Sequence, residues 1–331
     1  MRKSWILWTI VSMLAVLTGC AVSTSPRPTP MVISPRQIVG GTLALRERWR
    51  VQGACGCGRN LPHLAATDTG QIVQLHWAFD KGWQIRALDS GNGEMLWATD
   101  YGPFISLVSD EERVYVQRMY EIWAYSLLDG QYLWASHVKP RILYNIWVED
   151  DMLFIAGEGE LYLLDSRTGK ELEHIRLETD DDFPLLTRLG EVDLYKTWRT
   201  LRTVERKTGQ LLWEVEVGGA MQIHTRPILE RDVLLISDEG VVIAIDVRAG
   251  VVKWTNRDRP FASNSVVVDG FVYGLDYGAR LVQLDIETGQ VKGYLQFIPP
   301  QLNDSGNCIA SGKEMLFVCF DDSAELIALR R

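Results

Sequence analysis

Four cysteines and a histidine carry the most versatile chemistry in this 331-residue chain. Cys55 and Cys57 are separated by one residue, and Cys308 and Cys319 lie near the C-terminus. Two thiolates with His63 close in sequence have the ligand types that zinc prefers. In an oxidising compartment the same thiols form disulfides instead. We predict disulfides and no metal site, and because four cysteines allow three pairings, the sequence leaves the connectivity open.

The N-terminus indicates that the chain is exported, and therefore whether its cysteines meet an oxidising compartment. A basic start precedes the uncharged apolar run Trp5–Leu17, which is too short to span a bilayer and is typical of a secretory signal. The segment Leu17-Thr18-Gly19-Cys20 resembles the bacterial lipobox, in which the cysteine receives a diacylglycerol and the signal is cut just before it. Two acyl chains anchor a protein stably, whereas one does not. We predict a lipoprotein signal peptide over 1–19 and lipidation of Cys20; an ordinary signal peptide is the alternative.

A tether and a folded domain are predicted after the lipid site. Residues 20–42 are rich in Pro, Ser and Thr, and such segments stay extended and cannot bury a core. Residues 43–331 would form the folded domain. Ala21 after the modified cysteine indicates the outer membrane if the host is Gram-negative. In a host with one membrane, the anchor would hold the domain at the extracytoplasmic face of the cytoplasmic membrane.

Composition excludes one class of partner. The chain has 34 basic and 43 acidic residues, a net charge of −9, and 47% hydrophobic residues. Nucleic-acid binding requires a basic surface, so we expect no nucleic-acid partner. The apolar content is enough for a large core.

A repeat of 37 to 41 residues runs through the folded part. Each copy ends a strand with an acidic or hydroxyl residue, places a glycine four residues later, and in most copies places a tryptophan four residues after that. The first positions are Asp89, Ser126, Asp165, Glu205, Asp246 and Asp285; the glycines are Gly93, Gly130, Gly169, Gly209, Gly250 and Gly289; the third positions are Trp97, Trp134, Glu173, Trp213, Trp254 and Gly293.

The repeat has a structural explanation that needs no catalysis. An Asp at a strand end accepts hydrogen bonds from the amides of a tight turn. The glycine supplies a positive φ that reverses the chain into a hairpin. The tryptophan then fills the wedge between neighbouring sheets.

A period near 40 residues made of short strands is the size of one four-stranded propeller blade. Strands are predicted at Arg113–Val116, Met152–Ile155, Val233–Ile236, Gly270–Tyr273 and Met315–Val318. The chain ends at 327–331 before a last outer strand, and Arg46–Val51 with Trp49 supplies that strand from the other end. Their pairing would close the ring and remove exposed edges. We predict an all-β propeller of seven blades, with eight as the alternative.

The motif Asp-x-x-Thr-Gly-x-x-x-Trp resembles the PQQ-like propeller repeat over nearly all of residues 43–331. Asp165–Gly169 and Glu205–Trp213 carry the resemblance most clearly. The family includes quinoprotein alcohol dehydrogenases and non-catalytic lipoproteins of the BamB outer-membrane assembly type. Its enzymes carry two adjacent cysteines beside the quinone and a calcium ion near a catalytic Asp. Here one residue separates Cys55 from Cys57 and no calcium-ligand set is visible, so we predict no catalytic residue, no PQQ and no calcium.

The remaining candidates have plainer interpretations. The five histidines, His63, His76, His137, His174 and His224, lack the spacing of a zinc motif. The acidic run Glu178–Asp182 lacks the calcium-loop pattern and is predicted to be a solvated loop. If the ring closes, the first and last blades are neighbours, and we predict that at least one disulfide joins Cys55 or Cys57 to Cys308 or Cys319.

The sequence thus predicts an envelope lipoprotein whose propeller binds a protein partner, as a scaffold in envelope protein assembly. The membrane is contacted through the lipid on Cys20. Two alternatives stay open. One is a PQQ-dependent or other cell-surface enzyme, and the other is a propeller that binds an extracellular ligand or glycan.

Overall fold

The computed structural model describes the folded part of the chain in segments. These are residues 37–52, 64–78, 82–100, 106–118, 120–138, 145–149, 151–157, 160–176, 185–189, 191–196, 200–217, 227–238, 241–258, 260–298, 307–320 and 325–330. Cys20, Cys55, Cys57, His63, His224 and the run Glu178–Asp182 lie outside the described residues. Residues 35–331 form one folding unit, distinct from residues 1–34.

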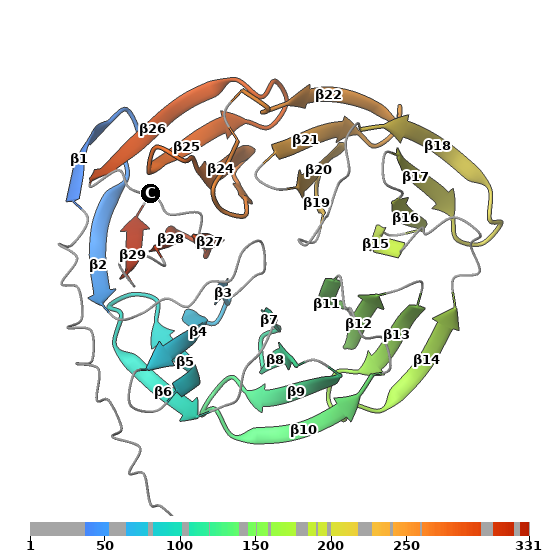
Figure 1. Cartoon of the computed structure of the whole chain (residues 1–331), viewed down its shortest axis with the longest axis horizontal. Helices are drawn as coiled ribbons and strands as arrows, with labels where there is room; N and C mark the ends of the chain where they lie inside the picture. The colour runs from blue at the N-terminus through green and yellow to red at the C-terminus, as the bar shows by residue number, and fades with distance from the viewer. Residues whose placement is uncertain are drawn as a thin grey trace, which may run out of the picture. The chain divides into compact units, whose positions relative to one another are not determined.

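All regular secondary structure in these segments is β, in seven antiparallel sheets that follow one another around a ring (Figure 1). Blade 1 is β3 (Leu64–Ala66), β4 (Gln71–Ala78), β5 (Gly82–Asp89) and β6 (Met95–Asp100); blade 2 is β7 (Ser106–Ser109), β8 (Arg113–Gln117), β9 (Glu121–Ser126) and β10 (Tyr132–His137); blade 3 is β11 (Asn145–Glu149), β12 (Met152–Gly157), β13 (Glu160–Asp165) and β14 (Glu171–Arg176). Blade 4 is β15 (Leu185–Leu189), β16 (Val192–Lys196), β17 (Thr200–Glu205) and β18 (Leu211–Glu216); blade 5 is β19 (Ile228–Glu230), β20 (Val233–Asp238), β21 (Val241–Asp246) and β22 (Val251–Thr255); blade 6 contains β23 (Val266–Val268), β24 (Phe271–Leu275), β25 (Arg280–Asp285) and β26 (Val291–Ile298). Among these residues, no helix is long and apolar enough to cross a bilayer.

Blade 7 is built from both ends of the chain. It contains β27 (Cys308–Ser311), β28 (Met315–Phe320), β29 (Glu325–Arg330) and, as its outer strand, β2 (Arg46–Gln52). Strand β2 pairs antiparallel with β29, with Trp49 opposite Ala328. This confirms the predicted seven-bladed all-β propeller and its closure by the terminal strands.

One strand precedes the ring closure. Gln37–Gly41, which the sequence analysis assigns to the end of the tether, forms β1 and becomes the fifth strand of blade 6. It pairs antiparallel with β26, with Gln37 opposite Ile298 and Gly41 opposite Leu295. An extended segment therefore already occupies the outer edge of this blade.

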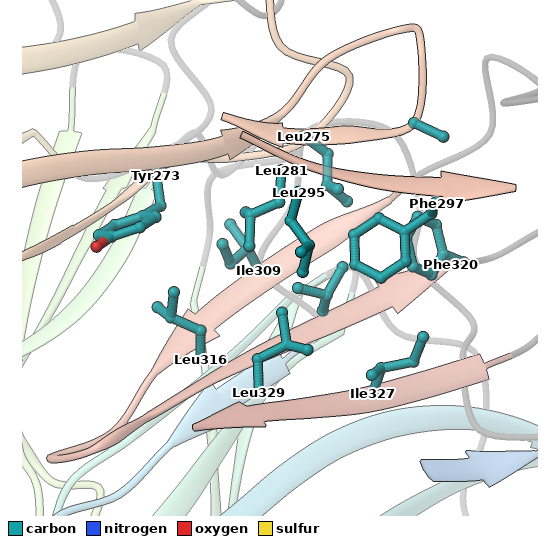
Figure 2. Close-up of a cluster of buried hydrophobic side chains, with 12 residues drawn as sticks. Tyr273, Leu275, Leu281, Leu295, Phe297, Ile309, Leu316, Phe320, Ile327 and Leu329 are labelled. Carbon is teal, nitrogen blue, oxygen red and sulfur yellow. The ribbon is translucent and has the colours of Figure 1, made fainter. Parts of the chain in front are cut away.

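The hydrophobic core lies between blades, because each sheet buries an apolar face against the next sheet. Figure 2 shows the cluster between blades 6 and 7, where Phe297 of β26 and Phe320 of β28 have ring centroids 5.1 Å apart. Leu281 of β25 and Leu329 of β29 are fully buried in the same cluster. Similar clusters join five other pairs of neighbouring blades, and the cluster between blades 3 and 4 draws its buried residues from blade 3.

Candidate functional site

The repeat residues form a set of closely similar turns. We call these the glycine turns; each joins the third and fourth strands of blades 1 to 6, and they span residues 89–94, 126–131, 165–170, 205–210, 246–251 and 285–290. In every turn the glycine amide donates to the carbonyl of the first residue at 2.8–2.9 Å. The glycine φ lies between +66° and +77°, a conformation that L side chains adopt only with strain.

The acidic residues stabilise these turns. The Oδ1 atom of Asp165 accepts hydrogen bonds from the Thr168 hydroxyl at 2.7 Å and the Thr168 amide at 2.8 Å, and these bonds hold the pKa of the carboxyl below its usual range. The pKa of Asp246 is lowered by the Ala249 amide, and that of Asp285 by the Thr288 hydroxyl. Carboxylates of this kind stay ionised and serve as turn caps.

The tryptophans join each blade to the glycine turn of the next. The Trp97 indole nitrogen donates to the Leu127 carbonyl at 2.8 Å, and a Cβ added at Gly130 would lie 2.5 Å from the Trp97 ring. We call this arrangement the Trp–Gly contact. It occurs at five junctions: Trp49 with Gly93, Trp97 with Gly130, Trp134 with Gly169, Trp213 with Gly250, and Trp254 with Gly289. The indole nitrogens donate at 2.6–3.2 Å to the carbonyls of Ser90, Leu127, Ser166, Val247 and Ile286.

Two junctions lack this contact. Between blades 6 and 7, Gly293 replaces the tryptophan, and a Cβ there would lie 2.6 Å from Leu43 and 2.9 Å from Thr42. The chain leaving β1 thus fills the space. Between blades 3 and 4 the tryptophan is replaced by Glu173, which is exposed, and none of the described residues lies within 4 Å of a Cβ built on Gly209.

The described cysteines lie where blade 7 meets blade 1. Cys308 and Cys319 face each other in register on β27 and β28, are 3% and 1% exposed, and are both disulfide-bonded. They belong to the core cluster that includes Ile72 of blade 1. Because Cys55 and Cys57 lie outside the described residues, the pairing across the seam stays a prediction.

A buried polar layer, which sequence reasoning missed, lies on the face of blade 1 that carries Ile72. Gln74 and His76 follow Ile72 at every second position of β4 and so share its face. Gln74 and His76 of β4 pair in register with Arg86 and Gln84 of β5, and all four are at most 9% exposed. Burial, reinforced by the charge of Arg86, lowers the pKa of His76 to about 4, and burial lowers the pKa of Arg86 to about 10. The only signal in the sequence is polar side chains alternating along two strands, a pattern that is also typical of a solvated face.

No group of three or more His, Cys, Asp or Glu side chains within the described segments is arranged to hold a metal ion. His76 is one member of the polar layer. His174 stacks on Tyr162 with ring centroids 4.1 Å apart, and His137 stacks on Tyr120.

Exposed apolar side chains lie on the outer strands of the blades. Met95 is 63% exposed, Tyr132 54% and Leu211 51%, on β6, β10 and β18. Each of these strands lies at the end of its sheet. No other described strand pairs with its outer edge. The pairing of β1 with β26 shows that such an edge accepts an extended segment.

Comparison with known proteins agrees with this architecture. A family model described as "Outer membrane protein assembly factor BamB" matches residues 46–192 and 195–307. The chain belongs to this family. The BamB of Yersinia pestis is 24% identical over 310 residues, covering 83% of this chain and 77% of that protein. The BamB of Moranella endobia is 22% identical over 284 residues, covering 75% and 73%. These relatives are named as assembly factors, and the predicted resemblance is confirmed.

Solved structures show the same fold at low identity. The crystal structure of BamB from Moraxella catarrhalis superposes with a TM-score of 0.58 at 14% identity, covering 87% of this chain and all of that one. A computationally designed protein, Ika8, gives 0.61 at 12% identity, covering 85% and 99%. Likeness to a designed protein underlines that this fold by itself does not specify function.

Proposed function

We propose that this chain is a lipid-anchored envelope protein that serves as a non-catalytic, protein-binding scaffold in the assembly of outer membrane proteins. The observation that carries the proposal is the family match, which extends from blade 7 through blade 6 and so includes almost the whole ring. The proposal gives this chain the role that its relatives' names describe.

The use of the repeat residues supports a scaffold. The acidic side chains of the repeat stabilise turns, and its tryptophans stabilise the junctions between blades. These side chains therefore make their contacts within the fold. What is presented outward is a series of exposed apolar side chains on successive outer strands, including Met95, Tyr132 and Leu211. Exposed apolar groups of this kind are typical of protein interaction surfaces.

The proposed anchor is the lipid on Cys20. Strand β1 begins at Gln37, so residues 21–36 would join the lipid to blade 6. An extended Pro-rich segment spans about 3.1 Å per residue, which gives a reach of about 50 Å. The scaffold would therefore work within that distance of the membrane surface.

Site-specific crosslinking in the native host tests the proposal. A photoreactive residue replaces Met95, Tyr132 or Leu211, one at a time, and the buried position Val114 serves as a control. We expect the exposed positions to crosslink to proteins that assemble the outer membrane, and deletion of the gene to lower the amount of folded outer membrane β-barrels. Exposed positions that give no crosslinks, together with unchanged β-barrel levels after deletion, would overturn the proposal.

Two further measurements test its parts. The Cys20→Ala variant is expected to leave the membrane fraction; a variant that remains there contradicts the lipid anchor. Titration of the purified chain with PQQ and calcium is expected to give no bound chromophore and no alcohol oxidation. A bound quinone with turnover would make the protein an enzyme.

A further inference from the structure

The glycine turn of blade 4, residues 205–210, is fully formed without the tryptophan that covers the others. The Gly209 amide donates to the Glu205 carbonyl at 2.8 Å, and the Thr208 hydroxyl donates to the Glu205 carboxylate. The φ of Gly209 is +70°, identical to those of Gly130 and Gly169. The backbone that receives an indole five times elsewhere is thus present here in the same conformation.

The surroundings of this turn differ from those of its counterparts. Gly209 is exposed, whereas Gly93, Gly130, Gly169 and Gly250 are buried. Within the described segments, no side chain lies within 4 Å of a Cβ built on Gly209. The exposed glycine therefore presents a preformed turn that no described side chain covers.

The interior of this junction does not compensate for the missing ring. The core cluster between blades 3 and 4 contains Trp147, Phe154 and Leu161 of blade 3, and among the described residues blade 4 contributes only Tyr195. The cluster between blades 4 and 5, in contrast, draws buried residues from both blades. Among the described residues, blade 4 therefore gives the junction at Gly209 less buried apolar surface than it gives its junction with blade 5.

Strand β14 presents acidic charges beside the open turn, whereas the basic residues of the turn itself, Arg206 and Lys207, pair with Asp193 and Glu191. Glu171 and Glu173 on β14 are both exposed and flank the exposed Leu172. At the equivalent places of β10 the residues are Tyr132, Leu133 and Trp134, which carry no charge. An occupant of this turn would therefore be favoured by a positive charge next to its ring.

We propose that the open glycine turn at Gly209 binds an aromatic side chain, preferentially an indole, from a segment of a partner protein that carries basic residues beside the aromatic one. The choice of indole follows from the five internal Trp–Gly contacts, and the choice of basic flanks follows from Glu171 and Glu173. The inference rests on the proposed function in one respect, since it takes the partner to be a protein.

The first test uses a capped Lys-Trp-Lys peptide as the probe and the full chain labelled with 15N-glycine. We expect a saturable shift of the Gly209 amide signal, no shift at the covered Gly130, and no response to a capped Lys-Ala-Lys peptide of the same charge. The Glu173→Trp variant supplies the missing indole from within the chain and is expected to weaken peptide binding by about tenfold or more. Its matched control, Glu173→Gln, removes the charge but leaves the turn open and is expected to weaken binding by about two- to fivefold.

A Gly209 signal that does not move, an equal response to the alanine peptide, or undiminished binding by Glu173→Trp would overturn the inference. Crosslinking in cells separates this failure from that of the proposed function. If a photoreactive residue at Thr208 gives no crosslinks while Met95 and Tyr132 still do, only the inference about Gly209 falls. If all three give none and deletion of the gene leaves the β-barrel levels unchanged, the scaffold role falls as well.

Discussion

The junction between blades 1 and 2 and the junction between blades 3 and 4 use the same turn with opposite outcomes. At the first, Trp97 covers Gly130 and both are buried; at the second, Glu173 leaves Gly209 exposed. Both glycines have a φ of +70°, and each fourth strand carries the same register shift as it pairs with the third. The local sequence therefore determines the conformation of the turn. Whether the turn is covered depends on a residue of the neighbouring blade.

The largest effect is expected from removing the covering indole. Trp97→Ala deletes a buried ring and its hydrogen bond to the Leu127 carbonyl, so we expect a loss of about 3–5 kcal/mol in the free energy of unfolding. Glu173→Ala removes an exposed side chain at the equivalent position and should change it by less than about 0.5 kcal/mol. Denaturant unfolding of both variants measures the difference, and equal losses would contradict the contrast between the two junctions.

Adding a methyl group to each glycine tests the same contrast from the other side. Gly209→Ala should cost only the strain of a positive φ, about 1–2 kcal/mol. Gly130→Ala bears that strain and also places a Cβ 2.5 Å from the Trp97 ring, so we expect a total of about 2–4 kcal/mol. Thermal unfolding followed by circular dichroism distinguishes the two; a larger loss at Gly209 would show that its turn is covered.

The junction between blades 7 and 1 sharpens the comparison, because it combines a Trp–Gly contact with a buried polar layer. The pKa of His76 is about 4 in the folded state, against an ordinary value near 6.5. The unfolded chain thus binds more protons between these values, and stability contributed by neutral His76 is present above pH 6.5 and is lost as the pH falls toward 4.

A pKa shift corresponds to at most about 1.4 kcal/mol of stability per pKa unit. We expect a loss of about 1–2 kcal/mol, which is below this limit because solvent screens part of the electrostatic interaction. His76→Gln removes this one titration, while Arg86 and Asp100, which accepts a hydrogen bond from the Gln84 amide, remain in both proteins. Unfolding free energies measured from pH 4 to 7 should fall less steeply for the variant. Parallel curves would contradict the buried, neutral state of His76.

A smaller destabilisation than at Gly130 is expected where the chain leaving β1 replaces a tryptophan. Gly293→Ala would place a Cβ 2.6 Å from the end of the Leu43 side chain, which can rotate away, so we expect a loss of about 1 kcal/mol or less. The change should appear first as faster hydrogen exchange of the Thr42 amide, which donates to the Tyr294 carbonyl at 2.8 Å. Exchange at Val114, far from β1, serves as the control and should not change.

Sequence reasoning works well for features that each repeat determines locally. The spacing of glycines and tryptophans predicts seven blades and the blade shared between the chain ends, because turn chemistry and strand alternation are written into every copy. The predicted strand limits differ slightly from the observed ones. The strand predicted from Gly270 begins at Phe271, as β24, because Gly270 belongs to the preceding turn with a φ of +77°.

Features that depend on distant partners could not be predicted in this way. Gln37–Gly41 contains two glycines next to a proline-rich segment, and it is a strand because the edge of β26 pairs with it. The polar layer around His76 looks like a solvated face in the sequence, and only the structure shows that its side chains are buried. Likewise, in the sequence Glu173 is only a deviation from the repeat. The structure shows that each repeat tryptophan covers the glycine turn of the next blade, so that Glu173 leaves Gly209 uncovered.

The claim that the turn at Gly209 is a complete indole site without its indole has a direct test in Glu173→Trp. We predict that this substitution raises the free energy of unfolding by about 1–2 kcal/mol, because it buries a ring on a preformed turn. In that background Gly209→Ala should become about as costly as Gly130→Ala, since the two positions would then be equivalent. A neutral or destabilising Glu173→Trp, with the cost of Gly209→Ala unchanged, would contradict the account.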